Sequence, residues 1–146
     1  MLFGKRKRIV KRILVVEDEP LIAFDNETML GDAGYEVVAT IDNFDDAIAL
    51  IDKDKVDLIL SDVRLQGSRT GLDLARAAKN RGIPILFATG HEPPEEACAL
   101  AVGCLMKPYS ERTLKGTLEC IERTLAGEKG KPPKGLTLYP LPDSGT

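Results

Sequence analysis

The stretch VDLILSD, residues 56–62, decides the fold class of this chain. It contains an apolar run, Leu58 to Leu60, that is followed by a serine and then by Asp62. A strand with one face in water alternates apolar and polar residues, whereas a strand covered on both faces is apolar throughout. The stretch therefore predicts a central strand of a covered parallel sheet, with Asp62 at its carboxyl end.

Segments with the periodicity of strands and of helices alternate on both sides of this strand. Further strands are predicted at 13–17, 36–40, 83–89 and 104–106, and helices at 20–33, 43–53, 70–81, 94–102 and 110–125. Pro20 suits the first turn of the first helix, and Gly34 suits its end. Five strands alternating with five helices predict an α/β fold, a doubly wound parallel sheet whose right-handed crossovers cover both faces.

The length and composition of the chain are those of a globular protein with one domain. Its 146 residues are 43% hydrophobic and 29% charged, and a domain of this size buries a substantial core. No apolar run approaches the ~20 residues that a membrane span needs. The start MLFGKRKRIVKR lacks the apolar stretch of a secretory signal. We therefore expect a cytoplasmic protein without a membrane span.

Charge is distributed unevenly along the chain. Residues 1–12 carry six Lys or Arg and no acid, which leaves 14 bases against 23 acids in the remainder. An acidic body argues against direct binding of nucleic acid. We expect three parts: a basic leader over 1–10, a domain over 11–126, and a flexible C-terminal tail over 127–146, which is rich in Gly and Pro.

The three cysteines do not form a recognisable disulfide or metal motif. Cys98, Cys104 and Cys120 are odd in number and lie far apart in the sequence, unlike a disulfide framework or a zinc pair. Cysteine that has no such role behaves as a small apolar residue. We therefore expect all three to be buried.

Polar side chains follow four of the predicted strands. In an open parallel sheet, ligands bind outside the carboxyl ends of the strands. The residues expected to converge there are Glu17, Asp18, Glu19, Asp62, Thr89 and Lys107. Crowded carboxylates repel one another unless a cation compensates them, and hard oxygen ligands suit Mg²⁺. A carboxylate beside Mg²⁺ can attack phosphorus to form an aspartyl-phosphate, while a lysine and a hydroxyl stabilise the charge on the phosphoryl oxygens.

The segments VVEDEP, LILSD, FATG and LMKPY occur in an order and spacing that resemble the receiver domain of two-component response regulators, over residues 11–126. The resemblance implies a flavodoxin-like (CheY-like) fold with strand order 2-1-3-4-5. It also implies that Asp62 is the phosphoacceptor. Glu17 and Asp18 match the acidic pair that holds Mg²⁺ together with Asp62 and the backbone carbonyl of Arg64.

The same resemblance assigns a switch and two residues that tune the phosphoryl lifetime. Thr89 matches the switch hydroxyl and Lys107 the phosphate-sensing lysine, whose bond to Pro108 is often cis in this family. Arg64 and His91 match positions that flank the path of the attacking water. An exposed loop histidine without such a role is the alternative interpretation of His91.

Position 104 departs from the usual pattern of the family. Receivers usually carry a Tyr or Phe three residues before the lysine, where this chain has Cys104. FATG preceded by Pro84 resembles the FAT GUY subgroup, which lacks that aromatic, although His91 and Glu92 differ from its motif. We therefore expect the switch to involve Thr89, Gly90 and Cys104, with ordering of the loop at 90–96 carrying the movement.

The expected function is that of a single-domain response regulator, because only about twenty residues follow the last predicted helix, too few for an output domain. It would accept a phosphoryl group from a histidine kinase or histidine phosphotransfer protein and then bind a downstream protein or relay the group. We expect a monomer. No enzymatic activity is expected beyond self-phosphotransfer and autodephosphorylation. The alternatives are a phosphate sink, a pseudo-receiver adaptor, and an aspartyl phosphohydrolase, which is disfavoured because Asp62-Val63-Arg64 lacks a second acid.

Overall fold

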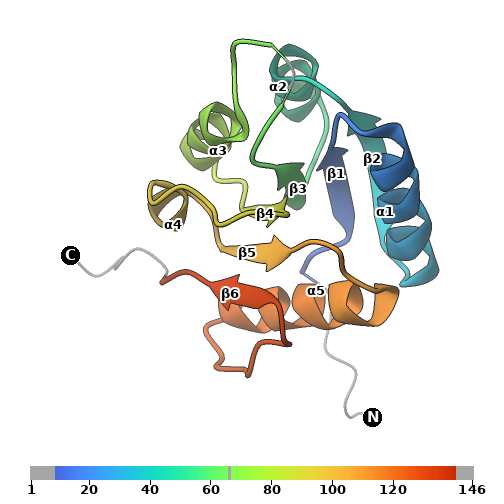
Figure 1. The fold of residues 1–146 in the computed structure, drawn as a ribbon, viewed down its shortest axis with the longest axis vertical. Helices are drawn as coiled ribbons and strands as arrows, with labels where there is room; N and C mark the ends of the chain where they lie inside the picture. The colour runs from blue at the N-terminus through green and yellow to red at the C-terminus, as the bar shows by residue number, and fades with distance from the viewer. Residues whose placement is uncertain (1–8, 66, 141–146) are drawn as a thin grey trace.

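A single six-stranded sheet forms the centre of the computed structural model, which describes residues 9–65 and 67–140 (Figure 1). The strand order is β2-β1-β3-β4-β5-β6. The first five strands run parallel in the predicted order, and β6 runs antiparallel to β5. The strands are β1 (Arg12–Val16), β2 (Glu36–Ile41), β3 (Leu58–Asp62), β4 (Ile85–Thr89), β5 (Gly103–Met106) and β6 (Leu136–Leu138).

Helices cover both faces of the sheet, as the doubly wound prediction requires (Figure 1). One buried cluster joins the sheet to α1 and α5, and a second joins it to α2, α3 and α4. The apolar run Leu58 to Leu60 is buried in full, with at most 1% of each residue exposed. The helices are α1 (Pro20–Asp32), α2 (Phe44–Lys53), α3 (Gly71–Asn80), α4 (Ala97–Leu100) and α5 (Glu111–Leu125).

Side chains at the start of three helices fix where those helices begin. The side chain of Asn43 accepts a hydrogen bond from the backbone N–H of Asp46, and Ser110 does the same for α5. Thr70 and Asp73 form a reciprocal capping box at α3. Each cap satisfies a backbone donor that has no partner within its helix. The predicted boundaries of these helices are therefore confirmed to within a residue.

The helix predicted at 94–102 is much shorter in the structure. Backbone N–H groups of 97–99 bond three residues back, which is the pattern of tight turns. At Ala101 the backbone becomes extended, and the N–H of Val102 donates to the carbonyl of Ile85 on β4. The chain therefore leaves the helix early because it joins the sheet at β5, and α4 keeps only four residues.

The expectation of a wholly flexible tail over 127–146 is wrong for the part that contains β6. Leu136 is buried against the α5 side of the sheet, and the N–H of Tyr139 donates to the carbonyl of Val102. Gly103 permits this pairing, because a Cβ there would lie 2.7 Å from the carbonyl oxygen of Thr137. Residues 141–146 and most of the predicted leader, residues 1–8, lie outside the described residues.

Two smaller expectations have mixed outcomes. Cys104 and Cys120 are buried as predicted, whereas Cys98 is exposed, because it lies on the outer side of the short α4 turn. The Lys107–Pro108 peptide bond is cis, as the resemblance implied. Among the described residues, none of the helices is both long and apolar enough to cross a membrane.

Candidate functional site

Three carboxylates meet at the carboxyl edge of the sheet, as the sequence predicted. Glu17 and Asp18 follow β1, and Asp62 ends the neighbouring strand β3. One oxygen from each of them can be chosen so that all three lie within 4.8 Å of one another. Hard carboxylate oxygens at this spacing fit a divalent cation such as Mg²⁺. The three carboxylates of the predicted metal site therefore lie close enough together to share one cation.

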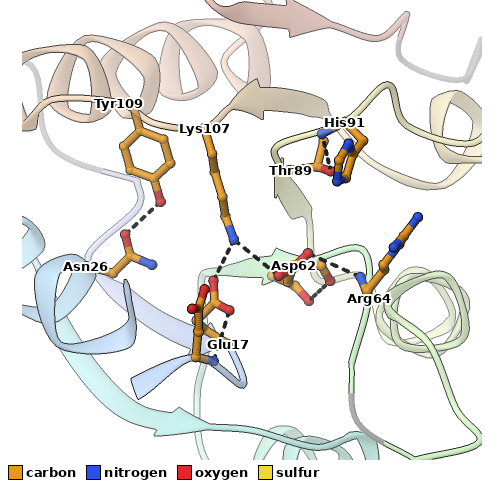
Figure 2. A network of polar contacts seen from close by, with 10 residues as sticks. Glu17, Asn26, Asp62, Arg64, Thr89, His91, Lys107 and Tyr109 are labelled. Atoms are coloured by element: carbon orange, nitrogen blue, oxygen red, sulfur yellow. Dashed lines mark hydrogen bonds and ion pairs between the residues drawn. The ribbon is translucent and has the colours of Figure 1, made fainter. Parts of the chain in front are cut away.

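Lys107 compensates part of this negative charge (Figure 2). Its ammonium Nζ lies 2.8 Å from Glu17 Oε1 and 3.2 Å from Asp62 Oδ2, and its side chain is only 16% exposed. The backbone N–H of Lys107 donates to the carbonyl of Thr89 at 2.8 Å. The lysine therefore reaches both carboxylates from a backbone that is itself tied to β4.

The pKa values of Glu17 and Lys107 both lie above their ordinary values. Burial raises the pKa of the Glu17 carboxyl, and the hydrogen bond from Lys107 opposes this rise only in part. Burial by itself lowers the pKa of Lys107, but the hydrogen bonds and charges of Glu17 and Asp62 outweigh it. The raised pKa of Lys107 reflects the negative charge of the two carboxylates around its ammonium, and carboxylates crowded in this way favour binding of a further cation.

Neighbouring groups orient the Asp62 carboxylate. Oδ2 accepts from Lys107, and Oδ1 accepts from the backbone N–H of Arg64 at 3.2 Å. Behind it, Gly71 begins α3, and a Cβ there would collide with the backbone carbonyls of Asp62 and Val63. Glycine therefore lets α3 pack directly against the loop that carries the acceptor.

Arg64 contributes its backbone N–H to this arrangement, whereas its side chain is exposed and points away from Asp62 (Figure 2). The predicted use of its carbonyl as a metal ligand remains a prediction. So does its role in tuning the lifetime of a phosphoryl group.

Thr89 and His91 lie at the end of β4, next to the acceptor strand. Asp62 pairs with Ala88 in the sheet, which places Thr89 one residue farther along. Thr89 is buried, and its hydroxyl oxygen accepts a hydrogen bond from the backbone N–H of His91 at 3.2 Å. Figure 2 shows Lys107 and Thr89 on different sides of Asp62, with the imidazole of His91 beside Thr89. Because the hydroxyl oxygen of Thr89 is the acceptor in its bond with His91, its own O–H group can still donate a hydrogen bond.

The two other predicted switch residues differ in their surroundings. Gly90 is exposed, and a Cβ there would meet no atom within 4 Å, so its conformation does not require glycine. Cys104 is buried in the cluster that contains Phe87 and Ala97. Tyr139, which follows β6, makes a side-chain hydrogen bond with Cys104, and burial raises the pKa of Tyr139 to about 12. An aromatic ring thus lies beside position 104 although it comes from the segment after β6.

Sequence reasoning missed a polar contact next to the lysine. The hydroxyl of Tyr109 donates to Asn26 Oδ1 at 2.6 Å (Figure 2). The signal for it was in the pattern of α1, because the buried stripe consists of Ala23, Asn26 and Leu30. A polar side chain in such a stripe needs a buried partner.

The parallel order of the first five strands and the acidic edge with its lysine define a CheY-like receiver. A family model described as the response regulator receiver domain matches residues 13–119, and the chain belongs to this family. Receivers are generally signalling domains rather than catalytic ones, they typically bind Mg²⁺ at an acidic pocket, and their phosphoryl donors are histidine kinases or phosphotransfer proteins.

Particular relatives are similar over about three quarters of this chain. The transcriptional regulatory protein PdtaR of Mycobacterium tuberculosis is 34% identical over 118 residues, which are 76% of this chain and 56% of the relative. The phyllosphere-induced regulator PhyR of Methylorubrum extorquens is 33% identical, over 73% of this chain and 41% of its own length. This chain therefore spans about half the length of these relatives.

Solved structures show the same fold. The chemotaxis protein CheY4 of Vibrio cholerae matches with a TM-score of 0.69 and 34% identity, covering 75% of this chain and 97% of that one. The response regulator PhyR of Brucella abortus matches with a TM-score of 0.63 and 31% identity, covering 75% of this chain and 46% of that one. The similarity to both structures supports the assignment of this chain as a response regulator.

Proposed function

We propose that this chain accepts a phosphoryl group on Asp62 from the phosphohistidine of a histidine kinase or phosphotransfer protein. The observation that carries the proposal is the position of the Asp62 carboxylate, which lies in the three-acid cluster and 3.2 Å from the ammonium of Lys107. Glu17, Asp18, Asp62 and the carbonyl of Arg64 would hold Mg²⁺. The metal, when bound, neutralises charge shared by these carboxylates and the phosphoryl oxygens.

Asp62, Lys107 and Thr89 carry out the other parts of the phosphoryl transfer. An oxygen of Asp62 attacks phosphorus, the P–N bond breaks, and the imidazole nitrogen of the donor keeps the electron pair. Lys107 leaves its contact with Asp62 Oδ2 to pair with a phosphoryl oxygen, while its contact with Glu17 limits how far it moves. The hydroxyl of Thr89 donates to another phosphoryl oxygen. Positioning and charge stabilisation supply most of the catalysis in such transfers.

Phosphorylation changes the conformation of Thr89 and of the segment at 90–96, which follows it. As Thr89 turns toward the phosphoryl group, its hydrogen bond from the backbone N–H of His91 breaks, and the segment takes a new arrangement. A groove of about 510 Å³ lies between this segment, β5 and β6, and its lining includes Glu92, Cys104 and Tyr139. A downstream protein that binds this groove would distinguish the two arrangements. Membership of the FAT GUY subgroup remains a prediction.

One experiment separates this proposal from the alternatives. The protein is incubated with Mg²⁺ and acetyl phosphate, and its intact mass and the release of inorganic phosphate are followed. A single lasting adduct supports a phospho-switch, relay or sink. Rapid continuous phosphate release without an adduct would favour a phosphohydrolase, and no reaction would favour a pseudo-receiver adaptor. A histidine phosphotransfer protein is then added to the phosphorylated chain. Transfer of the phosphoryl group to that protein distinguishes a relay from a phospho-switch and from a sink.

Substituting Asp18 should weaken the metal site. Asp18→Asn removes one anionic ligand from the cluster, and we expect the Mg²⁺ affinity measured by titration calorimetry to fall at least ~10-fold, since even outer-shell changes cost 10–100-fold. Asp42→Asn is the matched control, because Asp42 lies near the same edge but outside the three-acid cluster. Equal affinities of the two variants would contradict the assignment of Asp18.

Substituting His91 should change how long the phosphoryl group lasts. The imidazole lies beside Thr89 at the exposed side of the site, where it can orient the attacking water (Figure 2). We expect His91→Ala to slow decay of the acyl phosphate by about tenfold or less, a small effect for a group that orients water. Glu92→Ala, in the same loop, should decay at the wild-type rate. Unchanged decay in His91→Ala would leave His91 as an ordinary exposed residue.

A further inference from the structure

A short hydrogen bond joins two segments that supply opposite charges to the site. Tyr109 Oη donates to Asn26 Oδ1 at 2.6 Å. Asn26 is only 3% exposed, on the inner face of α1. Burial raises the pKa of Tyr109 well above its ordinary value, so the phenol keeps its proton at neutral pH. The contact is therefore a neutral, partly buried hydrogen bond between α1 and the loop before α5.

The two partners lie close in sequence to the charged groups of the site. Tyr109 follows Lys107 by two residues, and α1, which carries Asn26, begins directly after the acidic segment 17–19. Figure 2 shows the pair beside the lysine side chain. The bond therefore ties the segment that bears the lysine to the helix that follows the acids.

Packing between these two segments is incomplete. A cavity of about 130 Å³ lies between them, and its lining includes Ile22, Met29 and Pro108 as well as Asn26, Lys107 and Tyr109. A contact beside a cavity has fewer neighbouring atoms to fix its geometry than one in a close-packed core. The hydrogen bond is thus a specific constraint on the distance between α1 and the segment that carries Lys107 and Tyr109.

We propose that Tyr109 is a positioning residue that, through Asn26, holds the ammonium of Lys107 between Glu17 and Asp62. The inference rests on the proposed function, because the held lysine is the one that would stabilise the transferred phosphoryl group. The lysine backbone is fixed on one side by its N–H bond to Thr89 and on the other by Tyr109. A flexible four-carbon side chain reaches a defined place only if its backbone is fixed.

The first test compares two tyrosine variants that lose the same atom. Tyr109→Phe should lower the maximal rate of adduct formation from acetyl phosphate about tenfold, because a small misplacement of a charge-stabilising group has a large effect on rate. The KM for acetyl phosphate and the Mg²⁺ affinity should stay within about twofold of wild type, since Lys107 is not a metal ligand. Tyr35→Phe removes the hydroxyl of a buried tyrosine just before β2, at the edge of the parallel sheet opposite Lys107, and should react at the wild-type rate.

A double variant separates positioning from simple structural support. Tyr109→Phe leaves a buried Asn26 without its donor, which also lowers stability. Adding Asn26→Leu replaces the polar pair with an apolar contact, so the midpoint of urea unfolding should recover while the rate stays low. Recovery of the rate together with stability would overturn the positioning role, and so would an unchanged rate in Tyr109→Phe.

The outcomes also distinguish a failure of this inference from a failure of the proposed function. If the wild type forms no adduct, the proposed function fails and the inference fails with it. If the wild type forms the adduct on Asp62 and Tyr109→Phe forms it equally fast, only the inference fails. If Mg²⁺ affinity falls together with the rate, Tyr109 supports the metal site rather than the lysine, which also contradicts the proposal.

Discussion

Asp62→Asn is expected to abolish the phosphoryl adduct that the wild type forms with acetyl phosphate and Mg²⁺. An uncharged amide does not offer the anionic oxygen that attacks phosphorus. The substitution also removes one of the three carboxylates of the metal cluster. Both effects act in the same direction, so the expected change is complete loss of the adduct by intact mass rather than a slower reaction.

The loss is informative only if the variant folds. Asn keeps the size of Asp and still offers an oxygen to the N–H of Arg64, and the ammonium of Lys107 retains Glu17 as its partner. The free energy of unfolding should therefore change by less than about 1 kcal/mol, within the range of ordinary surface substitutions and weak ion pairs.

Asp54→Asn is the matched control for this substitution. Asp54 is exposed and precedes β3, whereas Asp62 ends that strand, so the same chemical change is made at the opposite edge of the sheet. Asp54→Asn should form the adduct at the wild-type rate. An adduct of normal yield in Asp62→Asn would place the acceptor elsewhere and overturn the proposed function.

The parallel part of the fold could be predicted from the sequence because local patterns and sheet burial agree. Strands covered on both faces must be apolar, and Leu58 to Leu60 meet that requirement within one short run. Helix caps such as Asn43 and Thr70 act within four residues, so they are visible in the sequence. The convergence of Glu17, Asp62 and Lys107 follows from the order of the strands once the sheet is parallel.

The features that were missed depend on contacts between distant residues. The partner of Asn26 is 83 residues away, and nothing local identifies it as Tyr109. The end of α4 is set by the bond from Val102 to β4, not by its own composition. The Gly and Pro content of 127–146 predicted a flexible tail and does not reveal that Leu136 is buried on a strand beside β5.

Leu136→Ala is expected to lower the free energy of unfolding by about 2–3 kcal/mol, the usual loss for a large apolar side chain removed from a core. Leu136 is 7% exposed and belongs to the same buried cluster as Leu105 and Leu118. Its backbone lies opposite Leu105 in the antiparallel pair of β5 and β6. Urea unfolding at constant Mg²⁺ concentration measures the change.

Thr137→Ala tests whether the loss comes from burial in the sheet. Thr137 is the next residue, lies on the same strand and is exposed, so its truncation should change the free energy of unfolding by about 0.5 kcal/mol or less. A flexible tail would make the two substitutions equally harmless, because neither side chain would then lose contacts on unfolding. A large effect at Leu136 with a small one at Thr137 therefore requires that β6 is part of the folded domain, and that the edge of β5 beside Cys104 is covered by the chain's own strand.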